Sequence, residues 1–306
     1  MDKYTIKKIK NQDLFEYLTG HMSESNLFNI FNCGSFISFF ADETLEKKKV
    51  NKSNFCKNRF CPLCAWRKAR KDSLKISILL KYIQEELGYE FIFLTLTAPN
   101  VKGSDLSDEI KKYNKSFKNL MQLKEVKKIT KGYVRKLEVT YNQERNDFHP
   151  HFHVMIAVNK SYFKSRDYIK KKQWLELWKD CMGDSSITQV DVRKMDTSDS
   201  NAIAEIAKYG AKDADYLISQ EVFDIFYKAL KGKQLITYSG AFKEALKLFN
   251  DGELDKYKEL DLTEYIYALE YHWRGKNYSL IEKRLLSDEE RIKVNKQLIE
   301  ELEVDQ

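Results

Sequence analysis

The sequence of 306 residues predicts an α+β fold with a central antiparallel sheet. Between about residues 88 and 220, runs rich in β-branched and aromatic residues alternate with stretches of helical periodicity. Their order is strand, helix, strand, strand, helix, strand, followed by a last helix. This is a split-βαβ, ferredoxin-like (βαββαβ) arrangement.

The individual elements follow from local signals. Strands are expected at 91–97, 133–141, 151–158 and 187–192, and helices at 105–122, 164–182 and 198–218. The polar loop 142–147 joins two strands as a hairpin, so these two should lie side by side. The apolar face of helix 164–182 carries Trp174, Leu177, Trp178 and Cys181.

Three segments separate along the chain. Residues 1–87 hold four of the five cysteines and end in an amphipathic helix near 69–86. Residues 88–220 form the α/β unit, and residues 221–306 look mostly helical, with turns at Gly232 and Gly240. We therefore expect a basic cysteine module, a catalytic domain and a helical C-terminal region.

The charge distribution favours a polyanionic partner. The net charge is +7, and the segment 47–75 holds eleven Lys or Arg against the single acid Asp72. The N-terminus lacks the apolar stretch of a secretory signal, and no run approaches the roughly 18 apolar residues of a membrane span. We expect a cytoplasmic protein without a membrane partner, whose cysteines bind metal or stay reduced.

A histidine pair marks a candidate metal site. His151 and His153 flank Phe152 in the third strand, so both imidazoles point to one face while Phe152 points into the core. Glu138 lies between two apolar residues of the preceding strand and should face the same way. Surface histidines on a wet sheet are the alternative, but three of the five histidines of the chain fall within five residues. A His/His/Glu set suits Mg²⁺ or Mn²⁺, and Zn²⁺ no less, so ligand type leaves the metal open.

A tyrosine downstream is a candidate nucleophile. On a continuous helix, Glu205, Tyr209 and Lys212 share a face. Tyrosine can attack phosphorus, a glutamate can act as a general base, and a lysine can hold phosphate oxygens. Tyr216 falls on nearly the same face and is the rival nucleophile, although we interpret it as structural.

A second metal site is predicted near the N-terminus. The compact cluster Cys56, Cys61 and Cys64, with Cys33 as a possible fourth ligand, suits a tetrahedral structural Zn²⁺. Reduced, unrelated thiols are the alternative, and Cys181 is expected in the core. Basic side chains flank the cluster and are expected to bind DNA: Arg59, Arg67, Lys68 and Arg70.

Several motifs stand in a fixed order. They are Phe-Leu-Thr-Leu-Thr at 93–97, His-Phe-His at 151–153 and Lys-Tyr-x-x-Lys at 208–212, together with the cysteine segment 54–64, Leu-Glu-Val-Thr-Tyr at 137–141 and Ala-Leu-Lys-Gly-Lys at 229–233. From about residue 33 to 249 the chain resembles the HUH endonucleases, and more closely the rolling-circle replication initiators of small plasmids of Gram-positive bacteria. Conjugative relaxases differ, because they carry the tyrosine near the N-terminus.

The resemblance implies an activity. It implies a nick in the plus strand at a hairpin of the double-strand origin, with Tyr209 joined to the 5′-phosphate, Glu205 activating water at termination, and His151 and His153 binding the metal. A host helicase is expected to unwind the DNA, because the sequence shows no helicase module or P-loop. A host polymerase is a further expected partner, and a homodimer is possible. The alternatives are a relaxase or transposase of the same superfamily, and a non-catalytic, zinc-containing DNA-binding regulator.

Overall fold

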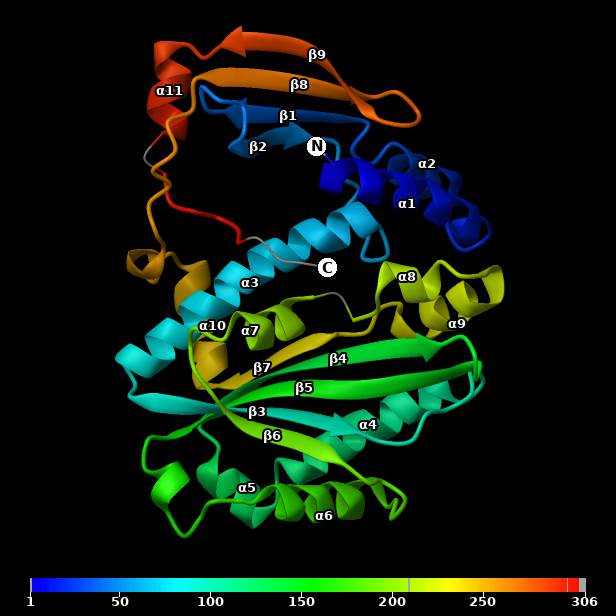
Figure 1. The fold of residues 1–306 in the computed structure, drawn as a ribbon. Helices are drawn as coiled ribbons and strands as arrows, with labels where there is room; N and C mark the ends of the chain where they lie inside the picture. Colours follow the sequence, from blue (N-terminus) through cyan, green and yellow to red (C-terminus); the bar gives the residue numbers. More distant parts are fainter. Residues whose placement is uncertain (1, 209, 296, 303–306) are drawn as a thin grey trace. The chain divides into compact units, whose positions relative to one another are not determined.

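A computed structural model describes residues 2–208, 210–295 and 297–302. Its contacts divide the chain into two compact units. Met1–Lys71 and Lys258–Gln306 make up one, here called the terminal unit, and Asp72–Tyr257 make up the other, here called the central unit. Both contain antiparallel sheets and helices, which confirms the α+β class (Figure 1).

The central unit is built on a five-stranded sheet in the order β6-β3-β5-β4-β7, in which all neighbours are antiparallel. Its strands are β3 (Tyr89–Thr97), β4 (Gly132–Asn142), β5 (Asp147–Asn159), β6 (Val190–Met195) and β7 (Ile236–Gly240). The four expected strands are present, although β6 begins three residues after the predicted start at 187. The edge strand β7 was not predicted.

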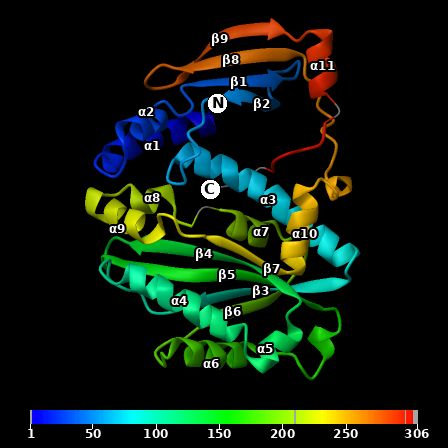
Figure 2. The same cartoon turned by 180° about the vertical axis from the view of Figure 1, so that it is seen from behind.

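Helices cover both faces of this sheet. The two opposite views agree that α4 (Leu106–Leu120), α5 (Lys124–Ile129) and α6 (Lys171–Met182) lie on one side, with α7 (Ser200–Ala207) and α10 (Ala241–Asn250) on the other (Figures 1 and 2). On the first side, Phe152 of β5 packs edge-on against Tyr113 and Phe117 of α4, with ring centroids 5.4 and 5.5 Å apart. The remaining elements of this unit are the later part of α3 (Pro62–Glu85) from Asp72 on, η1 (Tyr162–Lys164), α8 (Asp213–Tyr216), α9 (Gln220–Leu230) and η2 (Asp255–Tyr257).

The helix predicted at 198–218 is interrupted, so that prediction is wrong. Lys208 is extended (φ −55°, ψ 157°), and helical structure resumes only in α8. The interruption has a non-local cause, because the Gly210 carbonyl accepts a hydrogen bond from Val139 N of β4 at 2.7 Å. A Cβ atom at position 210 would lie 2.8 Å from the Leu137 carbonyl oxygen, so this approach to β4 requires glycine.

The helix predicted at 164–182 is shorter than expected. Residues 162–164 form the separate turn η1, and α6 starts only at Lys171. The start is fixed by a cap in which the Gln173 side chain accepts a hydrogen bond from Lys170 N at 2.8 Å. Helix 105–122 is confirmed as α4, which ends at Leu120.

The terminal unit joins the two ends of the chain in one sheet. Its strands follow the order β2-β1-β8-β9 and are β1 (Phe36–Ala41), β2 (Lys48–Ser53), β8 (Tyr267–Trp273) and β9 (Tyr278–Leu285). The helices are α1 (Asp2–Leu18), α2 (Glu24–Phe31), α11 (Asp288–Val294) and the first part of α3 (Pro62–Glu85). α3 contains the amphipathic helix predicted near 69–86 but begins directly after Cys61.

The prediction that residues 221–306 are mostly helical is therefore wrong for β7, β8 and β9. In β8 the side chains of Leu269 and Tyr271 alternate with polar ones, and the strand pairs with β1 from Phe36↔His272 to Ala41↔Tyr267. The contacts group the chain into two units, whereas the sequence predicts three consecutive segments. Within the part of the chain that is described, no helix is long and apolar enough to span a membrane.

Candidate active site and cysteine cluster

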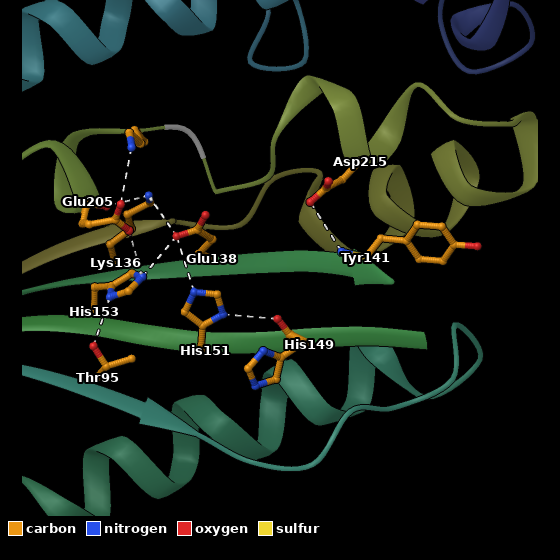
Figure 3. Close-up of polar contacts among 10 residues, drawn as sticks. Thr95, Lys136, Glu138, Tyr141, His149, His151, His153, Glu205 and Asp215 are labelled. Carbon is orange, nitrogen blue, oxygen red and sulfur yellow. Dashed lines mark hydrogen bonds and ion pairs between the residues drawn. The ribbon is translucent and has the colours of Figure 1, made fainter. Parts of the chain in front are cut away.

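The histidine pair lies on the sheet face opposite to α4. Since Phe152 packs against α4, the alternation of β5 turns His151 and His153 toward the side of α7. Glu138 of β4 lies directly across from His151 in the strand register. One ligand atom from each of Glu138, His151 and His153 lies within 4.8 Å of the others, so the structure brings the predicted ligand set together (Figure 3).

The donor atoms converge on one carboxylate oxygen. Glu138 Oε2 is 3.1 Å from His153 Nε2 and 3.4 Å from His151 Nε2. Both rings have their other nitrogen engaged, because His153 Nδ1 lies 3.3 Å from Thr95 Oγ1 and His151 Nδ1 lies 3.3 Å from the His149 carbonyl oxygen. Such contacts fix ring orientation and leave Nε2 directed toward a ligand.

A lysine that the sequence did not single out completes this face. Lys136 is opposite His153 in the register, is fully buried, and has its Nζ 3.6 Å from Glu138 Oε2. Burial alone would raise the pKa of Glu138, but the Lys136 ammonium and the hydrogen bonds from the histidines hold this pKa well below its usual range. Burial lowers the pKa of His153, which favours the neutral imidazole that binds metals. The sequence carried a signal for this residue, because Lys136 lies two residues before Glu138. Alternation along a strand puts the two side chains on the same face.

Glu205 joins the site from the end of α7. Its Oε2 is 3.3 Å from His153 Nε2 and its Oε1 is 3.4 Å from Lys208 Nζ. Tyr209 lies outside the described residues. Its neighbours in the chain are held beside the site, since Lys208 contacts Glu205 and Gly210 is hydrogen-bonded to β4 next to Glu138.

Of the two remaining candidates near the tyrosine, Lys212 departs from the expected position and Tyr216 does not. Lys212 is exposed at the N-cap of α8, beyond the break, so the predicted helix face shared with Glu205 is wrong. Tyr216, the rival nucleophile, is 1% exposed and packs against Phe223 and Phe226 with ring centroids 6.3 and 6.2 Å apart. This burial agrees with a structural role for Tyr216.

The four cysteines of the predicted zinc cluster converge in the terminal unit. The Sγ atom of Cys33 is 3.5 Å from that of Cys64 and 3.7 Å from that of Cys61. The Sγ atoms of Cys56 and Cys64 are 3.7 Å apart. Four sulfurs held about 2.3 Å from a tetrahedral zinc ion lie about 3.8 Å from one another. The spacing therefore fits zinc, and Cys33 has the geometry of the fourth ligand.

Backbone and side-chain donors surround these sulfurs. The amides of Cys56 and Lys57 point at Cys33 Sγ and Cys64 Sγ over 3.3 and 3.2 Å, and the positive φ of Lys57 (59°) turns its amide inward. Hydrogen bonds from the neighbouring thiols lower the pKa of Cys64, whereas burial raises that of Cys61. The cluster can thus hold thiolate charge that a bound cation would balance.

Helix α1 contributes two further residues that the sequence did not indicate. Asn11 Nδ2 donates to Cys61 Sγ at 3.3 Å, and Lys8 Nζ donates to Asn11 Oδ1 at 3.1 Å and to the Phe31 carbonyl at 2.6 Å. Lys8 is 1% exposed, so α1 places a buried cation close to the thiolate cluster. The fifth cysteine, Cys181 on α6, is partly buried and lies outside the cluster.

Comparisons with known proteins identify the family. A sequence profile described as "Replication protein" matches residues 47–279, which include the whole Glu138/His151/His153 site and three of the four clustered cysteines. The chain belongs to this replication protein family. It is 53% identical over 221 residues to a "Protein rep" from Staphylococcus aureus. That alignment covers 72% of this chain and 96% of the relative.

Two further relatives carry the same name. A "Protein rep" from Bacillus sp is 35% identical over 250 residues, covering 74% of this chain and 81% of its own. Another from Streptococcus pneumoniae serotype 2 is 33% identical over 249 residues. That alignment covers 79% of this chain and 77% of the relative. No solved structure matches the chain.

The basic residues of this replication protein differ in what surrounds them. Arg59 and Lys68 are exposed. By contrast, the Arg67 guanidinium lies 3.9 Å from the centroid of the Phe55 ring. The Arg70 guanidinium lies 5.2 Å from the Trp66 ring centroid and 3.4 Å from a Glu301 oxygen. Both arginines thus contribute to packing.

Proposed function

We propose that this chain initiates rolling-circle replication of a plasmid by nicking one DNA strand at the origin, with Tyr209 as nucleophile. The observation that carries the proposal is the convergence of Glu138, His151 and His153 beside Glu205 in a replication protein. The strand order β6-β3-β5-β4 supports it, because this is the order of a split-βαβ domain of the HUH type.

The donor set fits a divalent metal. Two ligand atoms about 2.1 Å from an octahedral ion lie about 3.0 Å apart. The separations of 3.1 and 3.4 Å between Glu138 Oε2 and the histidine Nε2 atoms are close to this value. Mg²⁺ or Mn²⁺ bound there would polarise a phosphoryl oxygen and neutralise developing charge.

In the proposed nick, the phenolate oxygen of Tyr209 attacks the scissile phosphorus. A bond forms between that oxygen and the 5′-phosphate, the bond from phosphorus to the 3′-oxygen breaks, and the leaving 3′-oxygen takes up a proton. The exposed Lys212 ammonium can contact phosphate oxygens of the bound strand. Because the nick conserves a phosphodiester, attack by a free 3′-hydroxyl re-joins the strand.

Glu205 is proposed to activate water at termination. Its carboxylate is partly exposed, with 37% of the side chain accessible, and lies 3.3 Å from His153 Nε2. A carboxylate at this position can remove a proton from a water molecule that attacks phosphorus. A second DNA strand would then be released by hydrolysis instead of becoming covalently bound.

The terminal unit is proposed to bind a structural zinc ion and the duplex origin. The sulfur spacing of the cysteine cluster supports the zinc, and the exposed Arg59 and Lys68 support phosphate contacts. A host helicase is proposed to unwind the duplex, and a host polymerase is proposed to extend the free 3′-end. A cytoplasmic location and a possible homodimer belong to the same proposal.

The test uses single-stranded oligonucleotides carrying the origin of the plasmid that encodes the chain, labelled at either the 5′- or the 3′-end. With Mn²⁺, the 3′-label should migrate with the denatured protein and the 5′-label with a shorter free strand. Tyr209→Phe should abolish both products while leaving DNA binding intact, and EDTA should abolish them in the wild type. Tyr216→Phe is the matched control.

Other outcomes would change the assignment. Loss of the adduct in Tyr216→Phe but not in Tyr209→Phe would move the nucleophile to Tyr216. Absence of any nick by wild-type protein that binds the oligonucleotide would reject the nuclease in favour of a DNA-binding regulator. Glu205→Ala should still nick but should leave stable adducts, and normal termination by this variant would contradict the role of Glu205.

A further inference from the structure

Lys136 is buried at the metal site without a role in the nick described above. Its side chain has no exposed surface, although lysines are almost never fully buried without a partner. The ammonium donates to the Glu205 carbonyl at 2.7 Å and lies 3.6 Å from Glu138 Oε2. It therefore contacts both a metal ligand and the end of α7 (Figure 3).

The hydrogen bond to the Glu205 carbonyl lies at the C-terminal end of α7. The last carbonyls of a helix lack partners within the helix, and a cation there is stabilised by the helix dipole. α7 ends at Ala207, so the Glu205 carbonyl is among these groups. Lys136 thus anchors the end of α7 to β4 immediately before the extended residue Lys208.

We propose that Lys136 is a positioning residue, which sets the distance between the metal ligands and the segment that begins at Glu205. The inference rests on the proposed function, because the segment continues into the proposed nucleophile. Through its backbone contact, Lys136 holds the end of α7 so that Glu205 Oε2 lies 3.3 Å from His153 Nε2.

The charge of Lys136 separates this role from simple packing. A cation beside Glu138 repels a divalent ion at the same carboxylate, so its removal should not weaken metal binding. Misplacement of Glu205 and the residues after it should nevertheless slow the reaction. A residue that only supported the fold would lower metal affinity, stability and rate together.

The experiment compares Lys136→Met with Arg135→Met in the full chain. Arg135 is the adjacent buried cation, but it points to the opposite face, between the Phe117 and Phe152 rings at 4.9 and 4.2 Å. Single-turnover nicking of the 3′-labelled origin oligonucleotide gives the rate, and Mn²⁺ titration of the protein without DNA gives the dissociation constant.

Lys136→Met should lower the nicking rate by about 10- to 100-fold, as expected for a misplacement on the order of 1 Å. Its Kd for Mn²⁺ should stay equal or decrease. Arg135→Met should keep the wild-type rate per folded molecule. If Lys136→Met does not fold, Lys136→Gln replaces it, with the same expectation.

Two results would overturn the inference: a rate within twofold of the wild type, or a loss of Mn²⁺ affinity parallel to the loss of rate. Both results count only if the wild-type protein nicks the oligonucleotide in the same assay. A wild type that binds the oligonucleotide without nicking would instead overturn the proposed function, and the inference with it.

Discussion

Cys33→Ser tests whether the residue most distant in sequence belongs to the cysteine cluster. Cys33 Sγ lies within 3.5 Å of Cys64 Sγ and 3.7 Å of Cys61 Sγ. Serine has nearly the same shape, but its hydroxyl stays protonated at neutral pH and is a poor ligand for zinc. The substitution therefore removes one ligand with little change in packing.

The expected loss of zinc affinity can be calculated from the contribution of one ligand among four. Structural zinc sites bind with apparent free energies of about 10–16 kcal/mol, so an equal share per ligand is about 3–4 kcal/mol. At about 1.4 kcal/mol for each factor of ten, zinc affinity should fall by about 100- to 1,000-fold. Because the proposed zinc ion would bind only the folded cluster, the terminal unit should lose stability at the same time.

Zinc content after dialysis against a chelator measures this loss, with release followed by a colorimetric zinc indicator. Wild-type protein should retain one zinc ion per chain, and Cys33→Ser should lose it. Cys181→Ser is the matched control, because Cys181 lies on α6 outside the cluster. Equal chelator resistance of Cys33→Ser and the wild type would refute the assignment of Cys33, and a zinc-free wild type would refute the site.

Three further predictions concern the central unit. Phe152→Ala should lower the free energy of unfolding of this unit by about 3–5 kcal/mol in urea titrations, because the buried ring fills the core beneath the histidines. A decrease below about 1 kcal/mol would contradict that packing. Gly210→Ala should slow nicking more than it lowers the melting temperature, because its Cβ would meet the Leu137 carbonyl at 2.8 Å; unchanged nicking would argue against the need for glycine. Asp215 accepts a hydrogen bond from Tyr141 N at 3.4 Å, and burial raises the pKa of its carboxyl group. Because folding then favours the protonated acid, the stability of the wild type should decrease as pH rises through the raised pKa. Asp215→Asn should therefore gain stability relative to the wild type as pH rises above about 4, the ordinary pKa of an aspartic acid, in urea titrations; a difference independent of pH would contradict this.

The parts of the site that follow from alternation along a strand could be predicted from the sequence. His151 and His153 share a face and Phe152 points into the core because side chains alternate in a strand, whatever the rest of the fold. Glu138 required only one more assumption, that the polar loop closes a hairpin. The family resemblance is likewise confirmed at the level of a replication protein.

Features that depend on distant contacts could not be predicted in this way. Residues 198–218 have local helical character, and the interruption arises from a hydrogen bond between Gly210 and β4, far away in the sequence. The strand β8 is stabilised by β1, at the other end of the chain, and its mixture of apolar and charged residues carries a weak local signal. Propensity is a weak prior where tertiary contacts of this kind compete with it.

The same distinction separates two parts of the candidate active site. The candidate ligands Glu138, His151 and His153 lie on adjacent central strands, where ladder hydrogen bonds and the Phe152 core fix their spacing. Glu205 approaches from a two-turn helix held at its end by Lys136. Metal binding should therefore tolerate changes in α7, whereas the rate of strand transfer should respond to them. This expected separation of affinity from rate is the reason why both quantities must be measured on the same variants.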